Sequence, residues 1–432
     1  MFKTVSRRLI GKTPAERAGR SLILATFLSA TGFTSVFSLL PLYMHQLVGQ
    51  GPGAVFWAGL AMAATPMAGA VVSPLWGKLA DRFGYRPMLL RACLSTAPVT
   101  LLMAIPDAPW QLVLLRALAG ALGSFQPAAM GALSSWSRPE DLSRAIGRLQ
   151  MAQIAGAIAG PLLGGGIATL YGIRAVPIAG GLVISLGALM VARWFHEPKS
   201  KRALLRGSNQ PLRPTLLWLP MLTLVAIQFT DGSFNPILPL LLAQGEPDPS
   251  TVAGLVGLAA AFNATAAAVG SNLSGHGFKR GVKPHTVVVV TSLLAALALS
   301  AAAAPLPWGL VLLRIACGGL AGGLAVAAFS AGGMAVLPGQ RGSAYGWLAS
   351  ASSFGYATSP IVAGAMAAID LRAVLLLDVV FCLLTTVGWR WAKAAVPTPA
   401  SATPASTPTQ PAAPTAVSAP PEEGLLDTNR ES

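Results

Sequence analysis

The sequence is divided into long apolar blocks, and this feature leaves very few folds open to the chain. A helix needs roughly 20 apolar residues to cross about 30 Å of hydrocarbon. Only 10% of the residues are Asp, Glu, Lys or Arg, whereas soluble domains contain about 25%. The blocks therefore predict an all-α membrane protein with twelve transmembrane helices. We expect the helices at approximately residues 21–45, 54–76, 88–105, 110–130, 145–170, 175–194, 215–243, 252–274, 285–304, 308–330, 343–368 and 373–391.

Positive charge gathers on one side of the predicted membrane. The net charge is +15, and Lys and Arg cluster before the first span, in the loops after even-numbered spans and after the last span. The loops on the opposite side carry only Arg174 and Arg372. Because positively charged loops remain in the cytoplasm, both termini are expected to be cytoplasmic. This topology accounts for the charge, so we do not expect nucleic acid as a partner.

The two halves of the chain repeat each other at an offset of 198 residues. Residues 109–116 read PWQLVLLR and recur at 307–314 as PWGLVLLR. Parallel halves of this kind pack around a central cavity, with the substrate site near the middle of the bilayer. We therefore expect a basic cytoplasmic N-terminus at 1–20, six-helix halves at 21–194 and 215–391, a cytoplasmic linker at 195–214 and a disordered cytoplasmic tail at 392–432.

The loop after the second span, residues 77–87, reads GKLADRFGYRP. Its glycines permit a tight turn, and Asp81 can accept hydrogen bonds from a helix N-terminus or pair with an arginine. A turn with only solvated charge is the alternative interpretation. The loop resembles the signature loop of the major facilitator superfamily, G-x-L-x-D-R-x-G-R-R, with Tyr85 in place of the first basic residue. This resemblance implies a gating loop that latches the two halves in the outward-facing state, formed by Gly77, Asp81, Arg82, Gly84 and Arg86.

The fifth span carries three glycines on one helix face, because Gly156, Gly160 and Gly164 are four residues apart. Small residues let another helix approach closely, and Pro161 removes a backbone hydrogen bond. Packing alone explains this much. The spacing is also similar to the family's antiporter signature, G-x8-G-x3-G-P-x2-G-G, which marks exporters, notably drug:proton antiporters. The matching positions are Gly147, Gly156, Gly160, Pro161, Gly164 and Gly165.

Four charged residues lie inside the predicted spans, away from the basic cytoplasmic ends of these spans. Asp231, in the seventh span, can bind and release a proton as its hydration alternates, or it can be paired permanently with an arginine. Arg116 resembles the family's fourth-helix arginine, which is linked to proton transfer, although it can also snorkel to the outer interface. Its repeat mate Arg314 has a structural role or contacts substrate. Asp378 lies near the outer end of the twelfth span, where we expect a structural role. The proton-coupling candidates are therefore Asp231 and Arg116.

Residues 73–76 (SPLW) and 88–91 (MLLR) look most like bacterial multidrug-efflux members of the superfamily. This resemblance implies a monomer in the bacterial inner (plasma) membrane that exports small amphipathic molecules or drugs, by proton antiport with alternating access. Its partners are then lipid, protons and a small-molecule substrate, with no cofactor, metal or enzymatic reaction. An exporter or importer of a specific metabolite such as a sugar or amino acid, or a non-transporting membrane sensor, is the alternative.

Loose recognition of drug-like compounds requires an apolar cavity with scattered polar groups. The polar residues of the predicted spans supply the candidates for such a lining. They are Gln126, Gln150, Gln153, Gln228, Asn235, Asn263, Tyr43, Tyr356 and Arg314.

Overall fold

The computed structural model describes most of both halves of the chain. The described residues are 14–49, 52–196, 212, 217–245, 249–277, 289–290, 293–294, 296–297, 307–367 and 371–395. These residues form helices and short connections, with no strand among them. Eight helical segments of the described part are long and apolar enough to cross a membrane. The all-α prediction therefore holds for this part of the chain.

The first half contains eight helices, which are α2 (Pro14–Ser38), α3 (Leu40–Val48), α4 (Pro52–Phe83), α5 (Tyr85–Leu102), α6 (Pro109–Leu122), α7 (Phe125–Trp136), α8 (Pro139–Tyr171) and α9 (Ala175–Trp194). In the described part of the second half lie α11 (Trp218–Gly245), α12 (Pro249–Gly277), α14 (Pro307–Met334), the short 3-10 helix η2 (Pro338–Gln340), α15 (Arg341–Ala367) and α16 (Leu371–Ala395). The ninth predicted span, 285–304, the linker and the tail lie almost entirely outside the described residues.

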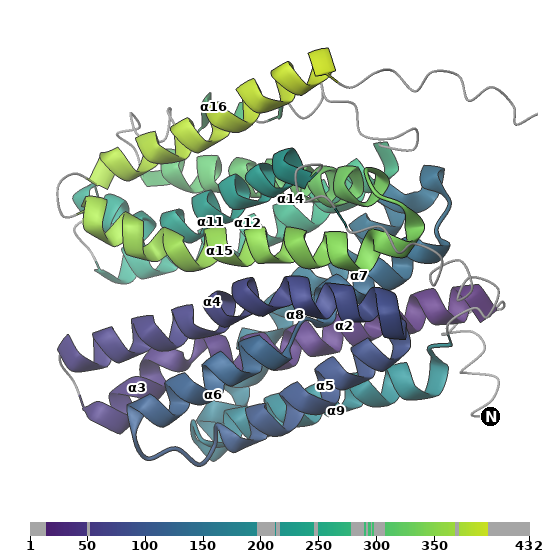
Figure 1. Cartoon of the computed structure of the whole chain (residues 1–432). Coiled ribbons are helices and arrows are strands. Elements are labelled where there is room, and N and C mark those ends of the chain that lie inside the picture. Colours follow the sequence, from purple (N-terminus) through teal and green to yellow (C-terminus); the bar gives the residue numbers. More distant parts are fainter. Residues whose placement is uncertain are drawn as a thin grey trace, which may run out of the picture.

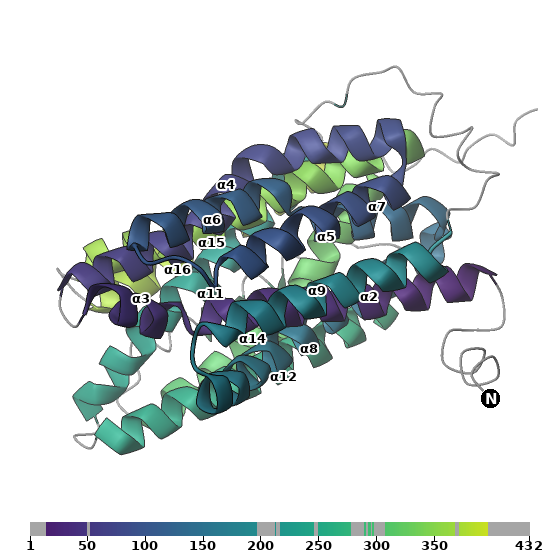
Figure 2. The same cartoon turned by 90° about the horizontal axis from the view of Figure 1, so that it is seen from below.

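The two halves lie side by side, and long helices of each run along the other. Figure 1 shows the first half, coloured purple to teal, against the second half, coloured green to yellow. Between them α4 packs along α15, and α8 packs along α12. Figure 2 shows the same bundle from below, with α4 again beside α15. These two helix pairs therefore hold the halves together.

Two of the predicted spans are broken, which corrects the expectation of continuous helices at 21–45 and 110–130. The first span ends at Ser38 and resumes at Leu40 as α3, and the fourth ends at Leu122 and resumes at Phe125 as α7. Each break lies just before a proline, Pro41 or Pro127. A proline has no backbone N–H, and its ring clashes with the carbonyl group four residues earlier. The chain therefore leaves the helix before each proline.

One apolar cluster joins the halves at the end of the molecule that contains the 77–87 loop. It includes Tyr85 and Leu142 from the first half and Phe329, Tyr345 and Leu348 from the second. All five side chains are buried. Close packing of such side chains gains van der Waals contacts, which drive the association of helices in a membrane. The two halves are therefore packed tightly together at this end.

Candidate functional site

The last turn of α4 places Asp81 against the start of a helix in the other half, so most of the predicted 77–87 loop is helical and only Gly84 separates α4 from α5. Gly84 ends α4 with a φ of +94°, a conformation that favours glycine. The Asp81 carboxylate accepts hydrogen bonds from the backbone N–H groups of Gly342 and Ser343, each at 2.7 Å, and from the Tyr85 hydroxyl at 3.1 Å. The first N–H groups of a helix have no hydrogen-bond acceptor within the helix. Asp81 provides the acceptor for two such groups of α15 from the opposite half.

The other predicted gating residues lie around this contact. Gly77 faces the Gly342 backbone so closely that a Cβ there would clash with the Gly342 carbonyl group. Arg86 donates a hydrogen bond of 2.8 Å to the Ala192 carbonyl oxygen at the end of α9, within the first half. Arg82 is exposed, with its guanidinium 5.5 Å from the Phe83 ring centre. The cross-half contacts of the loop are thus made by Asp81 and Gly77.

The glycine face of α8 packs directly on α2. A Cβ at Gly156 would lie 2.5 Å from the Phe27 carbonyl oxygen, and one at Gly164 would lie 2.6 Å from that of Ser35. Gly160 lies between them against the same helix, and Pro161 follows inside α8. The remaining two glycines differ. Gly147 packs across the half-to-half interface on Ser271 and Gly275 of α12, and Gly165 faces open space.

A cavity of about 410 Å³ lies between the two halves. Helices α2, α4, α5, α6, α7, α8 and α9 of the first half and α11 and α15 of the second contribute residues to its wall. Four of the predicted lining residues lie there: Gln126, Gln153, Gln228 and Tyr356. Gln153 donates to the side-chain oxygen of Gln126, and Gln126 donates to that of Gln150, each at 2.9 Å. Gln150 therefore supports the wall from behind.

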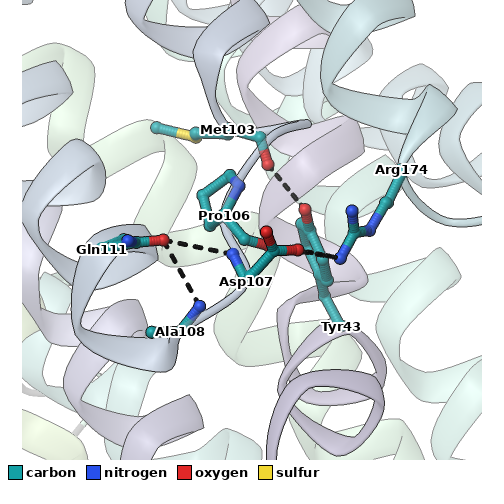
Figure 3. Close-up of polar contacts among 7 residues, drawn as sticks. All are labelled: Tyr43, Met103, Pro106, Asp107, Ala108, Gln111 and Arg174. Atoms are coloured by element: carbon teal, nitrogen blue, oxygen red, sulfur yellow. Dashed lines mark hydrogen bonds and ion pairs between the residues drawn. The ribbon is translucent and has the colours of Figure 1, made fainter.

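The structure places Tyr43 away from this cavity, contrary to the prediction. The break after Ser38 reorients this segment as α3, and the Tyr43 hydroxyl donates a hydrogen bond of 2.8 Å to the Met103 carbonyl oxygen. Figure 3 shows this contact beside the pair of Arg174 and Asp107, whose nitrogen and oxygen atoms are 2.7 Å apart. The hydrogen bond that Arg174 donates to the Asp107 carboxylate raises the pKa of Arg174. The cluster ties helix α3 to the α5–α6 and α8–α9 connections at the end of the first half opposite Asp81.

Two other candidates, Asn263 and Arg314, also lie apart from the central cavity. Asn263 packs on Gly318 of α14, within the second half. Arg314 lines a small pocket of about 20 Å³ between α11, α14 and α16. The side chain of Asn235 lies outside the described residues.

Arg116 is buried inside the first half and does not reach the outer interface. Its residue is 1% exposed, and its Nε donates a hydrogen bond of 3.3 Å to the Ala61 carbonyl oxygen. The guanidinium carbon lies 5.0 Å from the ring centre of Phe33 and 5.4 Å from that of Phe37. Both rings line the central cavity. Within the described residues, Nη2 of Arg116 has no hydrogen-bond partner.

Asp231 pairs with Arg314, the repeat mate of Arg116. An oxygen of the Asp231 carboxylate lies 2.6 Å from Nη2 of Arg314, whose side chain is 6% exposed. Asp378 lies nearby on α16, is fully buried, and accepts a hydrogen bond from the Ser233 hydroxyl. Both membrane carboxylates therefore belong to one polar network in the second half. Sequence position alone did not reveal that Asp378 joins it.

The break between α6 and α7 forms part of the cavity wall, and sequence reasoning missed it. Residues 123–127 all line the cavity, and Ser124 has a φ of +67°. Arg91 donates hydrogen bonds of 2.9 Å to the carbonyl oxygens of Leu122 and Gly123 at the end of α6. A side chain thus satisfies backbone groups that the break exposes. In the sequence, Pro127 was the residue that could have indicated this break.

Comparison with known proteins decides the family. The sequence matches the Major Facilitator Superfamily over residues 22–281 and 220–422. The chain belongs to the major facilitator superfamily. It is similar to the multidrug resistance protein MdtG of Salmonella dublin, with 35% identity over 309 residues that cover 70% of this chain and 76% of that protein. MdtG of Salmonella typhimurium is 34% identical over the same share of both chains.

Solved structures of the superfamily have the same fold. The human organic anion transporter MFSD10 superposes with a TM-score of 0.70 at 18% identity, over 88% of this chain and 100% of that one. The transporter FucP in its outward conformation gives a TM-score of 0.67 at 16% identity, over 88% and 99%. The predicted all-α, twelve-helix major facilitator fold is therefore confirmed, in a multi-pass membrane protein.

Proposed function

We propose that this member of the major facilitator superfamily exports small amphipathic molecules or drugs by proton antiport with alternating access. The observation that carries the proposal is the central cavity, whose wall is built from both halves. A site at the interface of two packed halves is exposed to either side in turn when one half rocks against the other. The similarity to the MdtG multidrug resistance proteins supports drugs as substrates.

Alternating access requires contacts between the halves that form in one state and break in the other. Asp81 makes such contacts with the first turn of α15. When these hydrogen bonds break, the backbone N–H groups of α15 and the Asp81 carboxylate are exposed. Water can solvate all of these groups, because they lie at helix ends. We therefore assign the gating role to the 77–87 loop, with the halves latched at the predicted cytoplasmic end. The glycine face of α8 supports this gate by keeping α2 close.

Proton coupling is assigned to the Asp231 and Arg314 pair together with Arg116. A carboxylate that leaves its arginine partner loses the charge that stabilises its ionised form, so its proton affinity rises. The Asp231 side chain is 38% exposed, which leaves it accessible to water, while Arg314 is 6% exposed. Movement of α11 relative to α14 is the step that would separate this pair and couple it to the conformational change.

The charge distribution and the bacterial relatives support an inner-membrane location with both termini in the cytoplasm. Superfamily transporters handle small-molecule substrates, and we propose that this one acts as a monomer without an enzymatic step. Its partners are then lipid, protons and the exported molecule.

Drug export is tested by expressing the protein in a pump-deficient bacterial host and measuring susceptibility to a panel of dyes and drugs. We expect resistance to several unrelated compounds. Unchanged susceptibility across the panel would count against multidrug export and would favour a specific metabolite as substrate.

Coupling is tested separately in inverted membrane vesicles, by measuring proton release when an exported compound is added. Asp231→Asn and Arg116→Ala are expected to reduce this release, with the expression level and thermal stability of each variant measured in parallel. Wild-type proton release in both variants would remove these two residues from the mechanism.

A further inference from the structure

The wall of the central cavity is mostly apolar with scattered hydroxyl and amide groups, and it contains no acidic side chain among the described residues. Hydroxyl and amide groups alternate there with aromatic rings, including Phe33, Phe37 and Tyr356. Across the whole sequence, only Asp231 and Asp378 are acids inside predicted spans. Neither of them lines the cavity. A cationic substrate would therefore find hydrogen-bond partners in this wall but no carboxylate as counter-charge.

Neither acid is available from a neighbouring position. Asp231 is already neutralised by Arg314 at 2.6 Å, in a separate pocket of the second half. Asp378 is 0% exposed and accepts its hydrogen bond from Ser233. Recruiting either carboxylate to a substrate cation would leave a buried arginine or a buried serine hydroxyl without its partner. Breaking a buried ion pair in this way is strongly unfavourable.

A buried positive charge lies directly behind the cavity wall. Arg116 lies directly beneath Phe33 and Phe37 and is 1% exposed, so water screens it very little. Its Nη2 has no hydrogen-bond partner among the described residues, while its Nε donates to a backbone carbonyl oxygen and its guanidinium lies against two aromatic rings. A buried arginine without a carboxylate partner is costly and imposes a positive potential on its surroundings. The cavity therefore presents that potential to any molecule that enters it.

The break in the fourth span adds to the same sign of potential. Helix α7 begins at Phe125, and residues 124–127 at its N-terminus line the cavity. This end carries no side-chain cap, and the N-terminus of a helix has the positive end of the helix dipole. Arg91 contacts the adjoining carbonyl groups of Leu122 and Gly123. The Arg116 guanidinium and the N-terminus of α7 thus add the same sign of potential on this side of the cavity.

We propose that the central cavity selects amphipathic organic anions, with an anionic group drawn towards the Arg116 side and an apolar body against Phe33, Phe37 and Tyr356, and that it disfavours lipophilic cations. The proposal rests on the proposed export function, because it names the substrate class of the same cavity. A bound anion supplies the counter-charge that Arg116 lacks, so the protein and the substrate gain from the same contact.

Tetraphenylborate and tetraphenylphosphonium are matched probes, because they have almost the same shape and opposite charge. Their binding to the purified full-length protein in detergent micelles is measured by titration calorimetry. The wild-type protein is expected to bind the borate at least about tenfold more tightly, because the buried charge of Arg116 attracts the borate and repels the phosphonium. Equal affinities, or tighter binding of the phosphonium, would overturn the proposal.

Two variants separate the cavity from binding to the micelle. Gln153→Glu places a carboxylate on the wall with little change of shape, and it is expected to reduce or reverse the preference for the borate. Gln111→Glu adds the same charge at the start of α6, outside the cavity, where Gln111 only accepts hydrogen bonds from Asp107 and Ala108. This control is expected to keep the wild-type preference. An unchanged preference in Gln153→Glu contradicts the assignment of the site.

Arg116 itself is tested by Arg116→Met and Arg116→Lys, with thermal unfolding as the check that each variant is folded. The methionine variant is expected to lose most of the borate preference, whereas the lysine variant keeps it. Export in pump-deficient cells is scored independently. Export of cations but not anions would contradict this inference and leave the export function standing, whereas export of neither class would contradict the export function.

Discussion

The pair of Asp231 and Arg314 is the residue-scale contact on which the second half most depends. Asp231→Asn leaves a nearly buried guanidinium without its counter-charge, so we expect the free energy of unfolding to fall by roughly 1–3 kcal/mol. The double variant Asp231→Asn with Arg314→Met removes both charges and is expected to regain part of that loss. The measurement is an unfolding titration in mixed micelles, analysed as a double-mutant cycle.

The pair of Arg174 and Asp107 provides the matched control for this cycle. It is also an ion pair, at 2.7 Å, but its side chains are 48% and 81% exposed. Water and salt screen an exposed pair, so the same pair of substitutions there is expected to change stability much less. Equal losses at the two sites would mean that burial of Arg314 contributes nothing to its pairing.

At this scale the sequence identified the charged residues inside the membrane but not their partners. Asp231, Arg116 and Arg314 stand out because charge in an apolar block is costly and therefore rare. The pairing of Asp231 with Arg314 joins residues 83 positions apart in the chain, and helix periodicity does not specify such a contact. Tyr43 was misplaced for a related reason, because one break in the helix changes the direction of every side chain after it.

At the scale of elements, the packing of α8 on α2 depends on glycine at particular positions. A Cβ at Gly160 would lie 2.8 Å from both the Ser35 nitrogen and the Thr31 carbonyl oxygen. Gly160→Ala must therefore push α2 away, and overpacking of this kind costs roughly 1–3 kcal/mol. Thermal unfolding of the purified variant measures this loss. Reduced export at equal expression is expected with it.

Gly165→Ala is the control for this prediction, since it lies on the same helix and within the same sequence motif. Nothing lies within 4 Å of the position that its Cβ would occupy. An alanine in a helix is favoured over glycine by about 1 kcal/mol, so this variant is expected to be neutral or slightly more stable. A loss equal to that of Gly160→Ala would show that the effect does not come from the contact with α2.

The sequence predicted which segments are helical much better than where helices are interrupted. Apolar length is enough to recognise a span, because the hydrocarbon thickness sets it. Interruption depends on whether freed backbone groups find partners. At the α6–α7 break, Arg91 donates hydrogen bonds to the freed carbonyl groups. Trp76 also donates a hydrogen bond of 2.7 Å to the Ala121 carbonyl oxygen. By contrast, α4 continues through Pro66 and Pro74, so a proline alone does not identify a break.

At the scale of the whole molecule, the repeat predicted two halves but not the contacts that lock them together. The repeat relates α6 to the first part of α14, yet the fourth span is broken after Leu122, whereas α14 is continuous to Met334. The two halves are therefore unequal in structure as well as in sequence. The hydrogen bonds that latch the halves together are also asymmetric. The first half contributes the Asp81 carboxylate, and the second half contributes backbone N–H groups.

This latch leads to a prediction about the relative position of the halves. Asp81→Asn replaces a carboxylate by an amide, whose single oxygen cannot accept both backbone N–H groups as strongly and no longer complements the α15 dipole. We expect the halves to separate more often at this end. His196 and His276 are exposed residues at the ends of α9 and α12, in different halves, and spin labels there report the separation.

The labels are attached through introduced cysteines, which is practical because Cys93, Cys317 and Cys382 are all buried. Double electron–electron resonance in the Asp81→Asn background is expected to show a larger population at long distance. Asp141→Asn serves as the control, since it makes the same change in charge at a carboxylate that is 53% exposed and pairs with Arg144 of its own helix. Because only Asp81 contacts the opposite half, a latch mechanism requires the two distance distributions to differ. If they coincide, the packing of α4 on α15 and the apolar cluster around Tyr85 and Tyr345 hold the halves together without the carboxylate.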